Sequence, residues 1–86
     1  MKNSKRREPT QLSRAKTNYG EVVLDEERGQ YWHLNPTASL VASIVSAGGS
    51  VDDAVEAIVS RYDVSTDQAR ADVHKVVRQL RENHLL

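Results

Sequence analysis

The chain has no cysteine and no phenylalanine among its 86 residues, and it has only two prolines and one tryptophan. Without cysteine, neither a disulfide framework nor a thiolate metal site can form. Without phenylalanine, a core has to be assembled mainly from valine, leucine, isoleucine and alanine, with Trp32 as its largest member. Hydrophobic residues make up 38% of the chain, so the sequence predicts one small domain with a thin margin of stability.

Long apolar segments are also missing from the sequence. No run is long enough to span a bilayer, and no hydrophobic segment follows the basic N-terminus as a signal peptide requires. These two absences predict a cytoplasmic protein that does not enter a membrane.

A net charge is missing as well, because twelve basic and twelve acidic residues cancel. The charges are unevenly placed, since residues 1–16 carry a net +5 and the rest of the chain a net −5. An acidic body is a poor match to a phosphate backbone, which argues against binding of nucleic acid. The polar residues 1–10, interrupted by Pro9, predict a disordered basic arm before a domain over residues 11–86.

Two short runs are rich in residues that favour strands, E-V-V-L-D at 21–25 and Q-Y-W-H-L at 30–34. A turn that contains Gly29 separates them, so the pattern predicts a β-hairpin. A weaker strand is expected over residues 12–17, with N-Y-G at 18–20 as its turn. Together the three strands would form an antiparallel meander.

Three helices are expected after the strands. The first would begin at Pro36, because Asn35 can cap a helix and proline fits the first helical position. Gly48 and Gly49 would end this helix. The chain is therefore predicted to be an α+β protein, a three-stranded antiparallel meander followed by three α-helices.

The second helix is expected between Ser50 and Tyr62, and the third between Ser65 and about Asn83. The third would open with a capping box, since Gln68 stands three residues after Ser65. Its predicted core stripe is Ala69, Val73, Val76 and Leu80. Val77 lies roughly 70° from the centre of this stripe, which fits either packing on the second helix or the wall of a groove.

The residue types that carry catalysis or bind metals are present but do not form motifs. The three histidines, His33, His74 and His84, have no metal-ligand spacing, and no nucleophile stands in an elbow or in a triad order. The adjacent acidic pairs fall in a turn and at a helix start. We therefore expect no catalytic residue, no metal and no cofactor, and a chain that is not an enzyme by itself.

The strand 30–34 is the more informative feature. Alternation places Trp32 and Leu34 on one face, where we expect them to enter the core, and Tyr31 and His33 on the other. As the last strand of a meander it keeps one row of unpaired backbone groups, yet it lacks the charges or prolines that usually protect an edge. An extended peptide could add to this edge. A second copy of the chain could pair there too, as a weak homodimer.

At this point the sequence resembles a known family. The succession V-V-L-D-E-x-x-G-x-Y-W-x-L-N-P-T-A, a helix ending in G-G, a second ending in R-Y and a C-terminal L-R-E-N-H-L-L are similar to the PqqD-like proteins. The resemblance covers about residues 14–86. It is strongest to the stand-alone recognition elements of lasso-peptide biosynthesis, which serve ribosomally synthesised and post-translationally modified peptides (RiPPs).

This resemblance implies a winged helix-turn-helix-like fold that has lost nucleic-acid binding. It also implies that the leader segment of a precursor peptide, carrying a Tyr-x-x-Pro element, lies as an antiparallel strand on residues 30–34 and packs against the third helix. The leader would be delivered to a separate cysteine peptidase of transglutaminase-like fold.

The candidate leader-binding residues come from two segments. Those on the strand and the turn before it are Arg28, Gln30, Tyr31, Trp32 and His33. Those on the third helix are Arg70, Asp72, Val73, Val76 and Val77. Asp72 would accept a hydrogen bond from the leader tyrosine, and the three valines would form apolar walls.

Two other functions remain open at the level of sequence. One is a small winged-helix DNA-binding regulator, against which the acidic body and the mixed charges of the third helix argue. The other is a carrier or redox module of PQQ-type biosynthesis, from the same superfamily.

Overall fold

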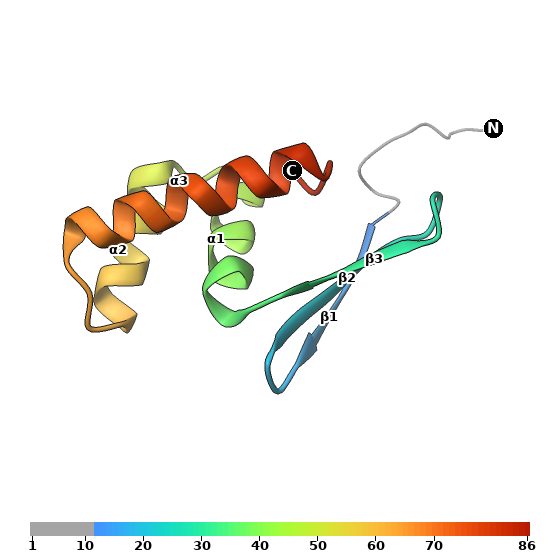
Figure 1. Cartoon of the computed structure of the whole chain (residues 1–86), viewed down its shortest axis with the longest axis horizontal. Helices are drawn as coiled ribbons and strands as arrows, with labels where there is room; N and C mark the ends of the chain where they lie inside the picture. Colours follow the sequence, from blue (N-terminus) through green and yellow to red (C-terminus); the bar gives the residue numbers. More distant parts are fainter. Residues whose placement is uncertain (1–11) are drawn as a thin grey trace.

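The computed structural model describes residues 12–86 and shows three strands followed by three helices (Figure 1). The strands are β1 (Leu12–Thr17), β2 (Gly20–Asp25) and β3 (Gln30–Leu34). The helices are α1 (Pro36–Ser46), α2 (Val51–Arg61) and α3 (Thr66–Glu82). The predicted α+β class and the antiparallel meander of order β1-β2-β3 are confirmed. The disordered arm predicted over residues 1–10 lies outside the described residues.

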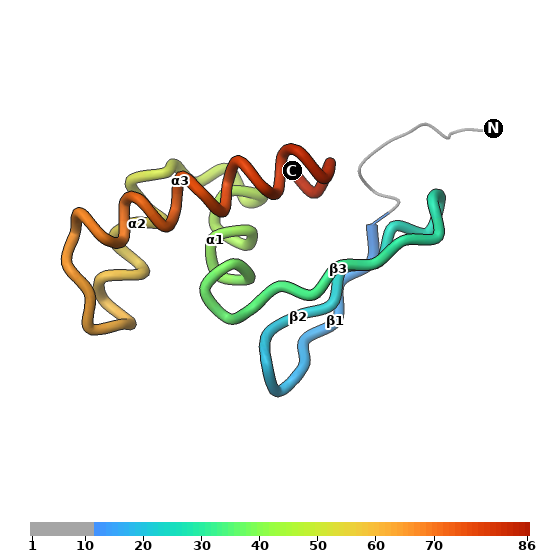
Figure 2. Tube along the Cα trace, viewed as in Figure 1, coloured from blue at the N-terminus to red at the C-terminus, as the bar shows by residue number. Residues whose placement is uncertain are grey.

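The sheet extends away from the three helices and is joined to them by the short link between β3 and α1 (Figures 1 and 2). The pairing register divides its side chains between two faces. The inner face carries Leu12, Arg14, Lys16, Glu21, Val23, Asp25, Gln30, Trp32 and Leu34. The outer face carries Ser13, Ala15, Thr17, Val22, Leu24, Tyr31 and His33. The predicted alternation of β3 therefore holds, with Trp32 and Leu34 turned inward.

Two turns fix this register. Gly20 opens β2 with a φ of 138°, and an added Cβ would clash with the Leu34 carbonyl oxygen, so only glycine fits there. In the turn between β2 and β3, Asp25 Oδ1 accepts the backbone N–H groups of Glu27 and Arg28, both at 3.1 Å. These bonds explain why a carboxylate with only 8% of its surface exposed is tolerated at the end of β2.

The helix starts follow the predicted caps, with one correction. Asn35 Oδ1 accepts the N–H of Ala38 at 2.8 Å, and Ser65 Oγ accepts that of Gln68 at 3.1 Å. The predicted capping box of α3 does not close, because the Gln68 side chain donates to Asp72 Oδ1 instead. A complete capping box stands at α2, between Ser50 and Asp53.

The core consists of two clusters. The larger one joins the helices through Val41, Ala54, Val55, Ile58, Ala69, Val73 and Val77. The smaller one joins the sheet to the helices through Val23, Leu34, Ala42 and Leu80. Among residues 12–86, no helix has the combined length and apolar character needed to cross a membrane.

Two residues that were expected in the core, Val76 and Trp32, are less buried than predicted. Val76 is only half-buried, whereas Val77, for which packing on the second helix and the wall of a groove were both open, is 6% exposed and belongs to the larger cluster. The reason is that α2 covers the flank of α3 that carries Val77, while the flank that carries Val76 faces the sheet, which stands further away. Leu34 enters the core as predicted, but Trp32 is only half-buried.

Candidate functional site

β3 forms an edge of the sheet. It pairs with β2 along one side, and no strand of the described chain lies on its other side. Its five residues are Q-Y-W-H-L, and only Leu34 is fully buried. The strand therefore presents a row of backbone N–H and C=O groups that a further strand could pair with.

A groove runs between this edge and α3. One hollow of about 380 Å³ lies at the Leu34 end of β3, and one of about 360 Å³ lies at the Gly29 end. The two hollows share the lining residues Trp32 and Asn83, and together we call them the β3–α3 groove. β3 and α3 run in opposite directions along it (Figure 1): Asn35 and Val76 line the same hollow, and Gly29 and Asn83 line the other.

The walls of the groove combine a buried apolar floor that includes Leu34 and Leu80, partly exposed apolar residues and a polar rim. Trp32 lies on the β3 side, and Val76 is the half-buried apolar residue on the α3 side. Gln79, Glu82 and Asn83 supply the polar rim of α3. Such a groove can hold an extended chain whose apolar side chain enters between Trp32 and Val76 while polar groups bind at the rim.

The structure brings five of the predicted site residues to the groove. They are Gln30, Tyr31, Trp32, His33 and Val76. The register places the Tyr31 and His33 side chains on the outer face of the sheet, where the Tyr31 side chain is 65% exposed and the two rings meet edge-on with centroids 6.0 Å apart.

Two further candidates lie near the ends of the groove without lining it. Arg28 stands in the turn before β3, with its Nε 3.7 Å from Asp25 Oδ2. Asp72 lies one helical turn before Val76 on the same flank of α3 and accepts a hydrogen bond from Gln68 at 3.1 Å.

The remaining three candidates lie elsewhere. Val73 is fully buried and Val77 is nearly so, which makes both members of the helical core rather than walls of a groove. Arg70 points toward α2, where its Nη1 lies 2.7 Å from Asp52 Oδ1. The flank of α3 that carries Arg70 and Val77 is thus occupied by α2, and the flank that carries Asp72 and Val76 faces β3.

Sequence reasoning missed several residues of the groove, namely Asn35, Ala38, Gln79, Glu82 and Asn83. Gln79 and Asn83 follow Val76 by three and seven residues, which places them on the same flank of the helix. This spacing was visible in the sequence, but polar residues in the last turns of a helix resemble an ordinary solvated face. The Asn83 side chain donates to the Gln79 carbonyl oxygen at 3.0 Å, which holds it at the rim.

The described residues contain no group of three or more His, Asp or Glu side chains that could hold a metal ion. The groove itself offers backbone hydrogen bonds, an aromatic wall and neutral amides. These features suit recognition of a peptide.

Comparisons with known proteins point in the same direction. Residues 20–86 match the model of the family described as coenzyme PQQ synthesis protein D (PqqD). No curated protein matches the chain. A solved structure described as lasso peptide synthetase B1 complexed with the leader peptide is 38% identical, with 85% of this chain and 86% of that chain covered and a TM-score of 0.76. A second, TbiB1 in complex with the TbiA(beta) leader peptide, is 25% identical over 88% of each chain, with a TM-score of 0.77.

Proposed function

The chain belongs to the PqqD family, and we propose that it is an adaptor that binds the leader segment of a ribosomally synthesised precursor of the lasso-peptide class. The leader adds to β3 as an antiparallel strand and packs on the Val76 flank of α3. The observation that carries this proposal is the free aromatic edge of β3 beside a groove, in a chain 38% identical to a B1 protein that was solved with its leader peptide.

In an added strand, the backbone and the side chains of the leader contribute to binding in different ways. Backbone hydrogen bonds to β3 supply affinity that depends little on sequence. Selectivity comes from alternate leader side chains, which enter the hollow between Trp32 and Val76 or meet the rim amides. We assign the Tyr-x-x-Pro element of the leader to this hollow, with Asp72 as a hydrogen-bond acceptor at its entrance.

The direction of the bound leader follows as well. Because β3 runs from Gln30 to Leu34, an antiparallel leader has its N-terminal part near Leu34 and its C-terminal part near Gln30. The part of the precursor that follows the leader therefore leaves the groove beside Gly29 and Asn83. A processing enzyme would meet its substrate at this end of the molecule.

In this role the chain binds and orients the peptide, and another protein carries out the cleavage. We propose that this partner is a cysteine peptidase of transglutaminase-like fold and that the adaptor works in the cytoplasm, without a cofactor and without nucleic acid. In the absence of leader, the free β3 edge would let two copies pair weakly, and the leader would compete with that pairing.

A titration tests the proposed function. A fluorescent copy of the leader peptide bound by the 38% identical protein is mixed with increasing amounts of the chain, and its anisotropy is followed. We expect saturable binding that a scrambled peptide of the same composition does not show and that replacement of the leader Tyr or Pro by Ala weakens. Binding of the scrambled peptide with equal affinity, or binding of duplex DNA in place of either peptide, would contradict the proposal.

A further inference from the structure

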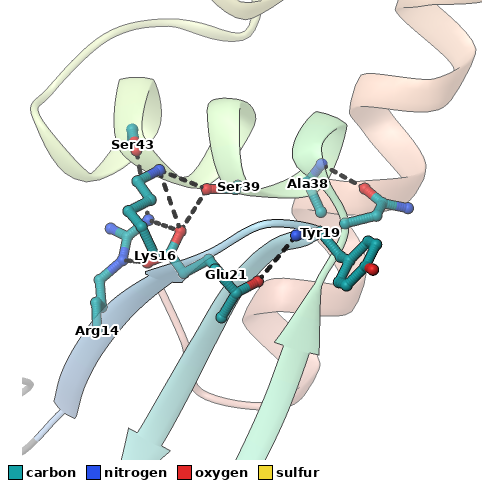
Figure 3. Close-up of polar contacts among 9 residues, drawn as sticks. Arg14, Lys16, Tyr19, Glu21, Ala38, Ser39 and Ser43 are labelled. Atoms are coloured by element: carbon teal, nitrogen blue, oxygen red, sulfur yellow. Dashed lines mark hydrogen bonds and ion pairs between the residues drawn. The ribbon is translucent and has the colours of Figure 1, made fainter.

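One polar cluster ties the sheet to the helices. In residues 12–86, every side-chain hydrogen bond between a strand and a helix involves members of this group. Its members are Arg14 and Lys16 on β1, Glu21 on β2, and Ser39 and Ser43 on α1 (Figure 3). We call it the Glu21 cluster.

Glu21 is the centre of the cluster and is only 2% exposed. The Arg14 guanidinium donates to both carboxylate oxygens, with Nη2 2.8 Å from Oε1, and the Ser39 hydroxyl donates to Oε1 as well. The hydrogen bonds from Arg14 hold the pKa of Glu21 below its ordinary value; burial opposes this shift, and the bond from Ser39 supports it. A buried carboxylate with this many partners has a well-defined position.

Two further bonds carry the link from β1 to α1. Lys16 Nζ donates to Ser39 Oγ at 2.8 Å and lies 3.7 Å from Glu21 Oε1. Arg14 Nη2 lies 3.4 Å from Ser43 Oγ. Charged groups therefore face Glu21 only from β1, hydroxyl groups face it from α1, and its neighbour across the β2–β3 pair is the apolar Leu34.

The apolar part of the same interface is thin. Val23, Leu34, Ala42 and Leu80 form the only cluster of buried residues that joins sheet and helices in the described chain. A cavity of about 590 Å³ lies on one side of it, between the inner face of the sheet and the ends of α1 and α3, and the β3–α3 groove lies on the other. Apolar packing alone thus leaves the sheet room to rotate against the helices.

Such a rotation would have a large effect on the groove, because the cluster lies at the junction of sheet and helices and the groove extends away from it. Glu21 pairs with Leu34, at the end of β3 where the chain enters α1, so the far end of the strand at Gln30 is a lever of about 13 Å. A tilt of roughly 10° about the junction would shift Gln30 by about 2 Å, which is enough to break hydrogen bonds of normal length.

We propose that the Glu21 cluster locks the tilt of the sheet against α1 and thereby sets the width of the β3–α3 groove. Glu21 and Ser39 are positioning residues, because neither lines the groove. The lock on the tilt follows from the cluster and the cavities alone. Its effect on peptide affinity rests on the proposed function.

The absence of cysteine makes the tilt directly measurable. Spin labels attached at Glu27→Cys, in the β2–β3 turn, and at Lys75→Cys, on the exposed side of α3, report the distance between sheet and helices by pulsed electron paramagnetic resonance. We expect a narrow distance distribution in the parent chain and a broader or shifted one after Ser39→Ala or Glu21→Gln. Ser13→Ala is the matched control, since it removes a serine hydroxyl that donates to Glu26 in the β2–β3 turn and not to a helix residue.

Ser39→Ala is the sharper of the two variants. It leaves the Arg14–Glu21 pair in place, and the better helix propensity of alanine partly offsets the hydrogen bonds that the Ser39 hydroxyl loses, so the variant should still fold with only a modest fall in melting temperature. The lock predicts in addition that affinity for the leader peptide of the 38% identical B1 protein falls about tenfold, the equivalent of one or two lost hydrogen bonds.

The two readouts separate the two proposals. A distribution in Ser39→Ala and Glu21→Gln as narrow as that of the parent chain and of Ser13→Ala would overturn the lock. If Glu21→Gln does not fold, the Ser39→Ala distribution decides alone. A broadened distribution supports the lock, and if the parent chain then binds no leader peptide, it is the proposed function that fails.

Discussion

Val76 and Val77 are chain neighbours on α3 with opposite surroundings, and they give the most direct contrast at the scale of single residues. Val77 is enclosed by the helical core, so Val77→Ala should lower the free energy of unfolding by about 2 kcal/mol, from two lost methyl groups and the cavity that they leave. Val76 lines the groove, so Val76→Ala should weaken leader binding and change stability less. Urea denaturation and leader titration of both variants measure this contrast. A Val76→Ala variant that binds normally would remove Val76 from the site.

The stability that Glu21 contributes should depend on pH. Its folded-state pKa is lowered by the hydrogen bonds from Arg14, so its contribution to stability is present above the unfolded value near 4.5 and is lost as the pH falls through the lower folded value. Denaturation at pH 7 and at pH 3 should therefore show a smaller loss on acidification for Glu21→Gln than for the parent chain. Equal losses in the two proteins would mean that the Arg14–Glu21 pair contributes nothing to the acid sensitivity.

At the scale of elements, β3 carries the proposed binding edge, and proline tests its backbone. Gln30 and His33 lie at positions of opposite parity, so only one of them has its N–H turned to the free edge. Proline at that position removes a β3 N–H that would donate to the added strand and should abolish leader binding, whereas proline at the other position breaks a bond to β2 and should mainly reduce stability. Circular dichroism melts and leader titrations separate the two effects. Two folded proline variants with unchanged affinity would exclude β3 as the docking edge.

The strands and helices were predictable from the sequence wherever local signals determine them. The strand runs, the two turns with glycine and the caps Asn35, Ser50 and Ser65 are local signals, and each produced the element that it predicts. Which apolar residues of α3 are buried is not determined by local sequence signals. Periodicity shows that residues 76 and 77 are both apolar, but which of them is buried depends on which flank α2 covers.

The groove was predictable only in part for the same reason. The parity of β3 placed Trp32 on the inner face correctly, whereas the depth of its burial depends on how far the sheet stands from α3. Gln79 and Asn83 belong to the groove because of that distance, and nothing in their own spacing separates them from solvated residues. Arg70 was a reasonable candidate by residue type, but its ion pair with Asp52 depends on the packing of α2.

At the scale of the whole molecule, the fold is a helical unit with a sheet that reaches away from it (Figure 1). This arrangement leaves the β3 edge free and places α3 beside it, so an extended peptide can meet a strand and a helix at once. The same openness makes the link between sheet and helices important, because a thin apolar cluster and the Glu21 cluster together hold the two parts in place.

The central claim is that a leader peptide becomes a fourth strand on β3, and residue-resolved amide hydrogen exchange tests it most directly. The sheet supplies its own control, because β1 forms the opposite edge and should not respond. On addition of the leader peptide, we predict new protection at alternate amides of β3 and no change at the outward amides of β1. Binding without protection on β3, or with equal protection on β1, would contradict the account.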